Sequence, residues 1–327
     1  MTTYSAVRTT GIYCRPGCGA KPLAENVRTF TLPAAAEAAG YRACLRCRPY
    51  RVAGPLADDT PELVCRAVQL IIAGALDEAN EDALGARLGV SARHLRRMFH
   101  DHLGATPDQF ARSRRAHFAR RLLDDSDLSV TDIAFASGFG SLRQFNRAMQ
   151  EVFRFSPREL RDRRRRTDRL AADGGLRLRL PFSSPYDWDA VLSSMRLVPG
   201  VESVADRVYR RTIVLDGSPG MLEIGPGGVD HLLLTAHLPY WEGVIHIVER
   251  AAQLVGTETH GVLGEWGPFE GAVRRLAPDA AAGLVLAYGL PVPGLGFGLT
   301  HAFPAPEAVI DEPGVAGDLA RAELALV

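Results

Sequence analysis

The chain has 327 residues, of which 46% are hydrophobic and 23% charged, a composition that excludes an intrinsically disordered protein. At roughly 150 residues per domain, this length predicts at least two domains. No apolar run reaches the roughly 18 residues that a membrane span needs, and the N-terminus lacks the charged and apolar regions of a signal peptide. We therefore expect a cytoplasmic protein without a membrane partner.

The formal net charge is zero, but the two halves of the chain differ. Residues 1–170 hold 28 Arg and Lys against 19 Asp and Glu, whereas residues 171–327 hold 10 against 19. A basic first half joined to an acidic second half predicts that only the first half contacts a polyanion.

Four of the five cysteines form two close pairs with the spacing C-x3-C-x25-C-x2-C: Cys14, Cys18, Cys44 and Cys47. In a cytoplasmic chain this pattern is typical of a tetrahedral Zn²⁺ site; disulfides in an oxidising compartment are the alternative. Such a site often only stabilises a small domain. Cys65 lies in an apolar helical run and is interpreted as a core residue.

Segments 6–18, 25–28 and 40–49 together resemble the zinc domain of the Ada family of alkylation-repair proteins. The resemblance implies that Cys14 irreversibly accepts a methyl group from a DNA methylphosphotriester, which makes the protein a stoichiometric S-methyltransferase. The other three cysteines would complete the metal site. Nearby arginines would hold the DNA backbone, unless they form only a solvated basic face: Arg15, Arg28, Arg46 and Arg48.

The charge of the centre suggests a switch. Four thiolates on one Zn²⁺ carry a formal charge of −2, and methylation reduces it to −1. The repulsion of a nearby phosphate would then fall by ~1–4 kcal/mol at close range. Ada proteins carry a further segment before this point, so we expect either a misassigned start or a zinc domain that lacks part of its support.

Residues 53–60 have the composition of a linker, and beyond them the sequence repeats at an offset of 50. The first copy holds Ala86, Ser91, Arg97, Thr106 and Pro107, and these recur as Ala136, Ser141, Arg147, Ser156 and Pro157. In each copy a turn with glycine precedes a serine N-cap and an amphipathic helix, the pattern of a helix-turn-helix motif.

Helical spacing predicts one buried face in the second helix of each copy: Leu95, Met98, Phe99, Leu142, Phe145, Met149 and Phe153. The opposite faces carry side chains suited to the DNA major groove: Arg93, Arg96, Arg97, Arg143, Gln144 and Arg147. A merely solvated helix would explain a single copy better. Two aligned copies in a basic segment favour DNA binding.

Residues 61–166 resemble the AraC/XylS DNA-binding domain. The resemblance implies two helix-turn-helix units joined by a rigid helix at about 107–124, with the recognition helices about 34 Å apart on the DNA. Gly104 matches the turn glycine of that family, but its counterpart is Arg154, which leaves the end of the second recognition helix open. The arginine-rich run 158–169 is expected to follow phosphates or to form a flexible basic tail.

Residues 175–256 alternate as strands do and include two predicted helices, 188–195 and 240–254, so they predict an α+β module. Three segments resemble the N-terminal domain of 3-methyladenine DNA glycosylase II (AlkA): 185–188, 198–202 and 209–212. In that family the domain is a scaffold without a catalytic residue.

Residues 257–327 look like a truncated remnant of the helix-hairpin-helix domain of such a glycosylase. The glycine-rich stretch 290–300 resembles a hairpin, and Asp318 follows at about the right distance for a catalytic carboxylate. However, Pro304, Pro306 and Pro313 would break the connecting helix, and the chain ends before the catalytic Asp would arrive. We therefore predict that glycosylase activity is absent.

These inferences predict a multidomain α+β protein: a small α/β zinc domain, an all-α double helix-turn-helix domain, an α+β AlkA N-terminal-like domain and an incomplete helical tail (1–52, 61–166, 175–256 and 257–327). The predicted function is an alkylation-response activator. Its expected partners are double-stranded DNA, at methylated backbone and promoter sites, and RNA polymerase, with no nucleotide cofactor. A regulator with a purely structural zinc site is one alternative, and a working glycosylase is another.

Overall fold

The computed structural model describes residues 3–51, 60–172, 174–259, 261, 263–311 and 314–324. Most of the predicted linker 53–60, together with Pro313, lies outside these residues. The chain divides into two compact units. Unit 1 comprises Met1–Leu170 and Trp241–Glu249, and unit 2 comprises Ala171–Tyr240 and Arg250–Val327.

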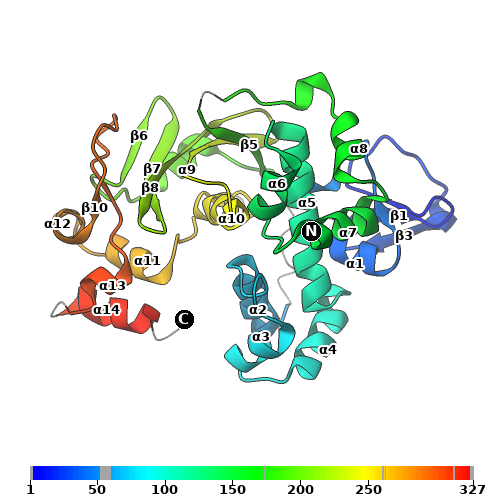
Figure 1. Ribbon diagram of the computed structural model, residues 1–327, viewed down its shortest axis with the longest axis horizontal. Coiled ribbons are helices and arrows are strands. Elements are labelled where there is room, and N and C mark those ends of the chain that lie inside the picture. The colour runs from blue at the N-terminus through cyan, green and yellow to red at the C-terminus, as the bar shows by residue number, and fades with distance from the viewer. Residues whose placement is uncertain are drawn as a thin grey trace. The chain divides into compact units, whose positions relative to one another are not determined.

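A four-stranded sheet with the order β3-β1-β2-β4 begins unit 1 (Figure 1). Strand β1 pairs antiparallel with β2 and β3, and β4 lies parallel to β2. A short helix, α1, packs on this sheet. The bounds are Tyr4–Val7 for β1, Ile12–Cys14 for β2, Val27–Phe30 for β3, Pro33–Ala38 for α1 and Arg42–Ala43 for β4.

Seven helices follow in the described part of unit 1: α2 (Glu62–Ile72), α3 (Glu81–Arg87), α4 (Ala92–Leu103), α5 (Pro107–Asp125), α6 (Val130–Ala136), α7 (Leu142–Phe153) and α8 (Pro157–Asp162). The predicted repeat is confirmed, because α4 and α7 have the same length and are offset by 50 residues. The long helix α5 contacts helices of both copies (Figure 1).

The ends of these helices follow from their capping residues. Ser91 and Ser141 accept a backbone N–H at the start of α4 and α7, and Thr106 and Ser156 form capping boxes before α5 and α8. The sequence did not determine where α7 ends. In the structure Arg154 ends this helix with φ +63°, in the same left-handed conformation that Gly104 adopts after α4.

The predicted buried faces of α4 and α7 are largely confirmed. The core of the two motifs includes four fully buried side chains: Leu95, Phe99, Phe145 and Met149. The prediction for Leu142 is wrong, because this side chain is 40% exposed. It is the first residue of α7 and lies at the margin of the covered face.

A five-stranded antiparallel sheet with the order β5-β9-β8-β7-β6 forms the centre of unit 2 (Figure 1). Its strands are β5 (Leu176–Pro181), β6 (Glu202–Ala205), β7 (Val208–Leu215), β8 (Ser218–Pro226) and β9 (His231–His237). The two predicted helices of this module are present: α9 (Trp188–Ser194) ends one residue earlier than predicted, and α10 (Val244–Leu254) begins four residues later. The first part of α10 is assigned to unit 1. The α+β prediction for this module is therefore confirmed.

The last segment of unit 2 consists of short elements: α11 (Pro268–Arg274), α12 (Pro278–Tyr288), β10 (Leu290–Pro291), β11 (His301–Ala302), α13 (Pro306–Val309) and α14 (Val315–Leu324). The stretch 290–300, which resembles a hairpin, begins with β10 and ends just before β11, and these two strands pair antiparallel. No helix in the described part of the chain is both long and apolar enough to cross a membrane.

Candidate zinc centre and DNA-binding helices

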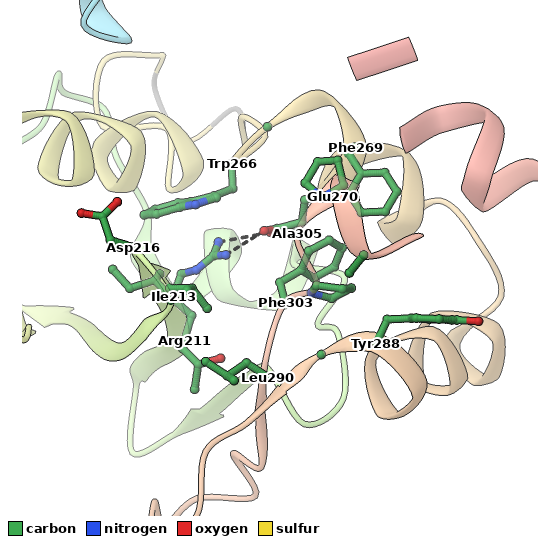
Figure 2. Close-up of a pocket in the computed structure, with 18 of the residues that line it drawn as sticks. Arg211, Ile213, Asp216, Trp266, Phe269, Glu270, Tyr288, Leu290, Phe303 and Ala305 are labelled. Atoms are coloured by element: carbon green, nitrogen blue, oxygen red, sulfur yellow. Dashed lines mark hydrogen bonds and ion pairs between the residues drawn. The ribbon is translucent and has the colours of Figure 1, made fainter. Parts of the chain in front are cut away.

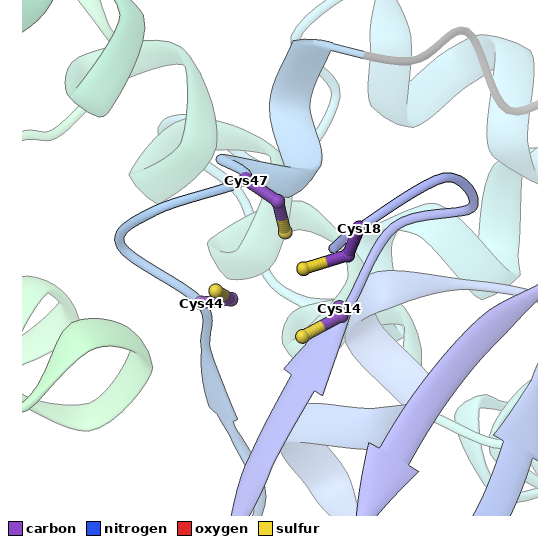
Figure 3. A group of neighbouring side chains, drawn as sticks. All are labelled: Cys14, Cys18, Cys44 and Cys47. Atoms are coloured by element: carbon purple, nitrogen blue, oxygen red, sulfur yellow. The ribbon is translucent and has the colours of Figure 1, made fainter. Parts of the chain in front are cut away.

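The four paired cysteines come together at the end of the first sheet. Their sulfur atoms all lie within 4.8 Å of one another. Figure 3 shows the four side chains pointing toward one another, from the end of β2, the turn after it and the loop after β4. The cluster joins the same residues that the spacing predicted: Cys14, Cys18, Cys44 and Cys47.

The backbone explains why these sulfurs meet. In the parallel register of β2 and β4, Tyr13 lies beside Ala43, so the cysteine that follows each of them lies at the same end of the sheet. The Cys44 N–H donates to the Tyr13 carbonyl over 3.0 Å and fixes this alignment. Gly17, at φ +72°, allows the tight turn that returns Cys18 to the cluster.

The donor set fits a divalent cation. The hydrogen bond to Cys44 is the main cause that raises the pKa of the Cys14 thiol, and the hydrogen bond from Cys14 is the main cause that lowers the pKa of Cys44. Four sulfurs this close cannot all be thiolates unless a cation offsets their charge. Zn²⁺ bonds sulfur at ~2.3 Å, which places the sulfurs of a tetrahedron roughly 3.8 Å apart.

The predicted major-groove residues lie on the outer faces of α4 and α7, and all six are exposed: Arg93, Arg96, Arg97, Arg143, Gln144 and Arg147. Two of them also form ion pairs within the domain. Arg96 pairs with Glu81 of α3, and Arg147 pairs with Glu151 one turn later at 2.8 Å. Carboxylates within the domain therefore already orient some of the cationic side chains on the outer faces.

Comparison with known proteins identifies relatives of three successive parts of the chain. Three family models match the chain: the metal binding domain of Ada over residues 2–50, a helix-turn-helix domain over 84–163 and the AlkA N-terminal domain over 177–258. The chain is 34% identical over 349 residues to the probable bifunctional transcriptional activator/DNA repair enzyme AlkA of Mycobacterium tuberculosis, with 94% of this chain and 70% of that protein covered. The chain belongs to this family of bifunctional transcriptional activators and DNA repair enzymes.

Two further relatives cover the first half of the chain. This chain is 33% identical over 158 residues to the bifunctional transcriptional activator/DNA repair enzyme Ada of Escherichia coli K12, with 48% of this chain and 43% of that protein covered. The solved structure of the methylated N-ADA/DNA complex is 33% identical and covers 35% of this chain and 84% of its own, with a TM-score of 0.16. Since the family is identified, the four-cysteine cluster is the Zn²⁺ site of its Ada-type domain.

Three of the four arginines predicted around the zinc centre remain accessible. Arg28 and Arg46 are exposed, and Arg15 is half-buried because its Nε donates to the Cys47 carbonyl over 2.9 Å. Arg28 also lies over the Phe30 ring, 4.8 Å from its centroid. These three side chains therefore keep part of their surface exposed to solvent.

The placement of Arg48 does not fit its predicted contact with DNA. Its side chain is 6% exposed and forms ion pairs with Asp168 at 2.6 Å and with Asp124 at 3.3 Å. A guanidinium with two buried carboxylate partners would lose both if it turned to a phosphate. The sequence could not reveal this, because the partners lie 76 and 120 residues later in the chain.

The arginine-rich run is also partly folded back on the domain. Arg164 and Arg169 both pair with Asp127, at 3.1 and 2.5 Å. The Arg163 guanidinium lies 4.0 Å from the centre of the Phe155 ring. The described run is therefore not a free tail along its whole length.

Unit 2 contains a pocket of about 640 Å³ that the sequence did not reveal. Figure 2 shows the Arg211 guanidinium, from β7, between the Trp266 ring and the Glu270 carboxylate. The pocket is also lined by aromatic side chains of three later segments: Phe269, Tyr288 and Phe303. Asp318 is not among the lining residues; it lies in α14, is 73% exposed and pairs with Arg321 at 2.6 Å.

Proposed function

We propose that this protein senses DNA alkylation by accepting a methyl group on Cys14 and that the methylated protein activates repair genes. The observation that carries the proposal is that the zinc-type cysteine cluster and both helix-turn-helix motifs belong to one compact unit. A sensor that reports through transcription requires an acceptor and promoter-binding elements in the same molecule. The family membership supports both halves of this reading.

The proposed transfer is a displacement at carbon. The Cys14 sulfur attacks the methyl carbon of a phosphotriester, an S–C bond forms, and the C–O bond breaks with its electron pair on oxygen. The DNA phosphate leaves as an ordinary diester anion. Bound Zn²⁺ keeps the sulfurs deprotonated at neutral pH. Because the product is a thioether, each protein molecule reacts once.

The most specific part of the proposal is the choice of Cys14 as the sulfur that accepts the methyl group. Cys14 is 7% exposed, whereas the other three cysteines of the cluster are half-buried. Exposure alone would favour those three. The assignment to Cys14 therefore rests on its resemblance to the Ada acceptor and on β2, which holds this sulfur at a fixed edge of the sheet.

The experiment incubates zinc-loaded protein with duplex DNA that carries isotope-labelled methylphosphotriesters, and tandem mass spectrometry then maps the label. We expect about one methyl group per protein, on Cys14. Cys65→Ala is the matched control. Cys65 lies outside the cluster and its thiol donates to the Thr60 carbonyl over 3.6 Å, so this variant should take up the same label. Label on another cysteine of the cluster would refute the assignment.

Two other functions predict different results, the first in the same assay and the second on DNA that carries alkylated bases. A regulator with a purely structural zinc site would bind promoter DNA but take up no label. A glycosylase would release free 3-methyladenine from alkylated DNA. We propose that glycosylase activity is absent, because Asp318 is exposed and paired with Arg321. Release of the free base would overturn this.

We propose that the outer faces of α4 and α7 contact promoter DNA. The protein would act in the cytoplasm, and RNA polymerase would be its partner at the promoter. Arg97→Ala or Arg143→Ala should cost about 1–3 kcal/mol of promoter binding if the side chain contacts a base edge. Arg66→Ala, on the exposed side of α2, is the matched control and should leave binding unchanged. Equal losses on promoter and random DNA would indicate phosphate contacts instead.

A further inference from the structure

Helix α5 carries buried polar side chains for which DNA binding offers no role. His117 is 7% exposed and Asp124 is fully buried. Burying such groups is unfavourable unless they are hydrogen-bonded or paired. Their partners therefore indicate what this face of α5 holds in place.

His117 contacts the strand that carries the proposed acceptor. Its Nε2 lies 2.8 Å from the Tyr13 hydroxyl and 2.8 Å from Glu37 Oε1, and the Tyr13 hydroxyl donates to the same Glu37 oxygen over 2.5 Å. Tyr13 is fully buried and directly precedes Cys14 in β2. On its other side the His117 ring packs edge-on against Phe153, the last residue of α7, with centroids 5.4 Å apart.

Asp124 contacts the segment that carries the last zinc ligand. It accepts a hydrogen bond from Tyr50, pairs with Arg120 at 2.9 Å and pairs with Arg48 at 3.3 Å. Arg48 directly follows Cys47 and has a φ of +54°, which non-glycine residues rarely adopt. Its ion pairs hold this backbone conformation beside the ligand.

The two contacts lie on the same face of α5. His117 and Asp124 are seven residues apart, which is two helical turns and roughly 10.5 Å along the axis. One reaches the residue before Cys14, and the other reaches the residue after Cys47. A rigid helix of the DNA-binding domain thus braces the cysteine cluster at both of its ends.

We propose that His117 and Asp124 are positioning residues of the methyl-acceptor centre, acting from the DNA-binding domain through Tyr13 and Arg48. The proposal rests on the proposed function in so far as Cys14 accepts the methyl group. The same contacts join the acceptor strand to the end of α7 through His117 and Phe153. By linkage, a change in the cluster that moves Tyr13 also biases the second recognition helix.

The test compares full-length wild type with His117→Ala, His117→Gln and Asp124→Asn. The glutamine amide can donate near the position of the imidazole Nε2, so it should restore what alanine removes. His102→Ala is the matched control, because His102 is an exposed histidine at the end of α4. Binding of each unmethylated variant to promoter DNA reports whether the helix-turn-helix domain is folded.

Two readouts separate positioning from the function itself. In single-turnover methyl transfer we expect His117→Ala and Asp124→Asn to be at least 10-fold slower than wild type, with His117→Gln within about 3-fold and His102→Ala unchanged. In Co²⁺-substituted protein, the visible and thiolate charge-transfer bands report the geometry of the cluster. We expect them to shift in the two slow variants and not in the other two.

The outcomes are distinct. If wild type takes up no methyl group while the Co²⁺ spectra shift as expected, the proposed function fails and the positioning role stands. If transfer rate and Co²⁺ spectrum of both slow variants equal those of wild type, the positioning role is refuted. If His117→Ala does not fold, Glu37→Gln replaces it, since this substitution weakens the same three-way contact without opening a cavity.

Discussion

Replacement of Arg48 by alanine should destabilise unit 1 far more than replacement of Arg46, two residues earlier. The Arg48 side chain is 6% exposed, and its carboxylate partners Asp124 and Asp168 are 0% and 6% exposed. Removal of one partner from a buried ion pair costs about 3–5 kcal/mol. Asp124 keeps Arg120, and Asp168 keeps Arg51, so we expect a loss near the lower end, about 3 kcal/mol. Alanine retains the Cβ, so the strain at this left-handed position does not change.

A urea titration would measure this loss of stability. Unfolding of the unit that contains the cluster would be monitored by the release of Zn²⁺ to a chromophoric chelator. Arg46 is exposed, so Arg46→Ala should change stability by less than about 0.5 kcal/mol. If Arg46 contacts a phosphate, the same variant should reduce the slope of log K against log salt by about 0.9. A loss below 1 kcal/mol for Arg48→Ala, or a salt slope that changes in Arg48→Ala as it does in Arg46→Ala, would refute the buried role.

Three more predictions follow from the described contacts. Arg154→Gly should stabilise the protein against urea by about 1 kcal/mol, because it relieves a left-handed non-glycine residue at the end of α7, whereas Gly104→Ala should destabilise it, since the new Cβ would lie 2.9 Å from another side chain. Burial alone would raise the pKa of Glu270, but the charge of Arg211 holds it below the ordinary value. This pair therefore stabilises the fold above the ordinary pKa and ceases to do so as pH falls through the folded-state pKa. Below pH about 4.5, urea stability should fall more steeply in wild type than in Glu270→Gln. Chelation of the metal should remove hydrogen-exchange protection from residues 3–51, and Zn²⁺ should restore it; unchanged protection would contradict a folding role for the metal.

The sequence predicted the elements that depend on local patterns. The cysteine spacing indicated the cluster because two turns and one cation are enough to bring four sulfurs together. The repeat at an offset of 50 indicated α4 and α7 because cap, hydrophobic period and turn all lie within one motif. Even the departure at Arg154 did not change the helix end, since this residue adopts the left-handed conformation and its backbone N–H donates to the Gln150 carbonyl.

Contacts between distant segments were not predictable in the same way. Arg48 has the sequence context of an accessible arginine beside a metal ligand, and only the fold brings Asp124 and Asp168 to it. The pocket in unit 2 likewise combines β7 with later segments that range from Arg250 to Ala308. Charge and hydropathy describe what a residue can do, whereas its partner depends on tertiary packing.

The buried polar face of α5 changes how the basic first half is understood. Its net positive charge predicted DNA binding as a property of the whole segment, yet several arginines neutralise carboxylates inside unit 1: Arg48, Arg51, Arg115 and Arg120. The positive field at the surface therefore comes from exposed arginines, among them those of the zinc domain and of α4 and α7 that we propose as DNA contacts. The Arg48–Asp124 pair joins the segment after Cys47 to the helix between the two motifs. Arginine in this half therefore has two separate uses: exposed copies form the proposed DNA contacts, and buried copies hold the fold around the zinc cluster.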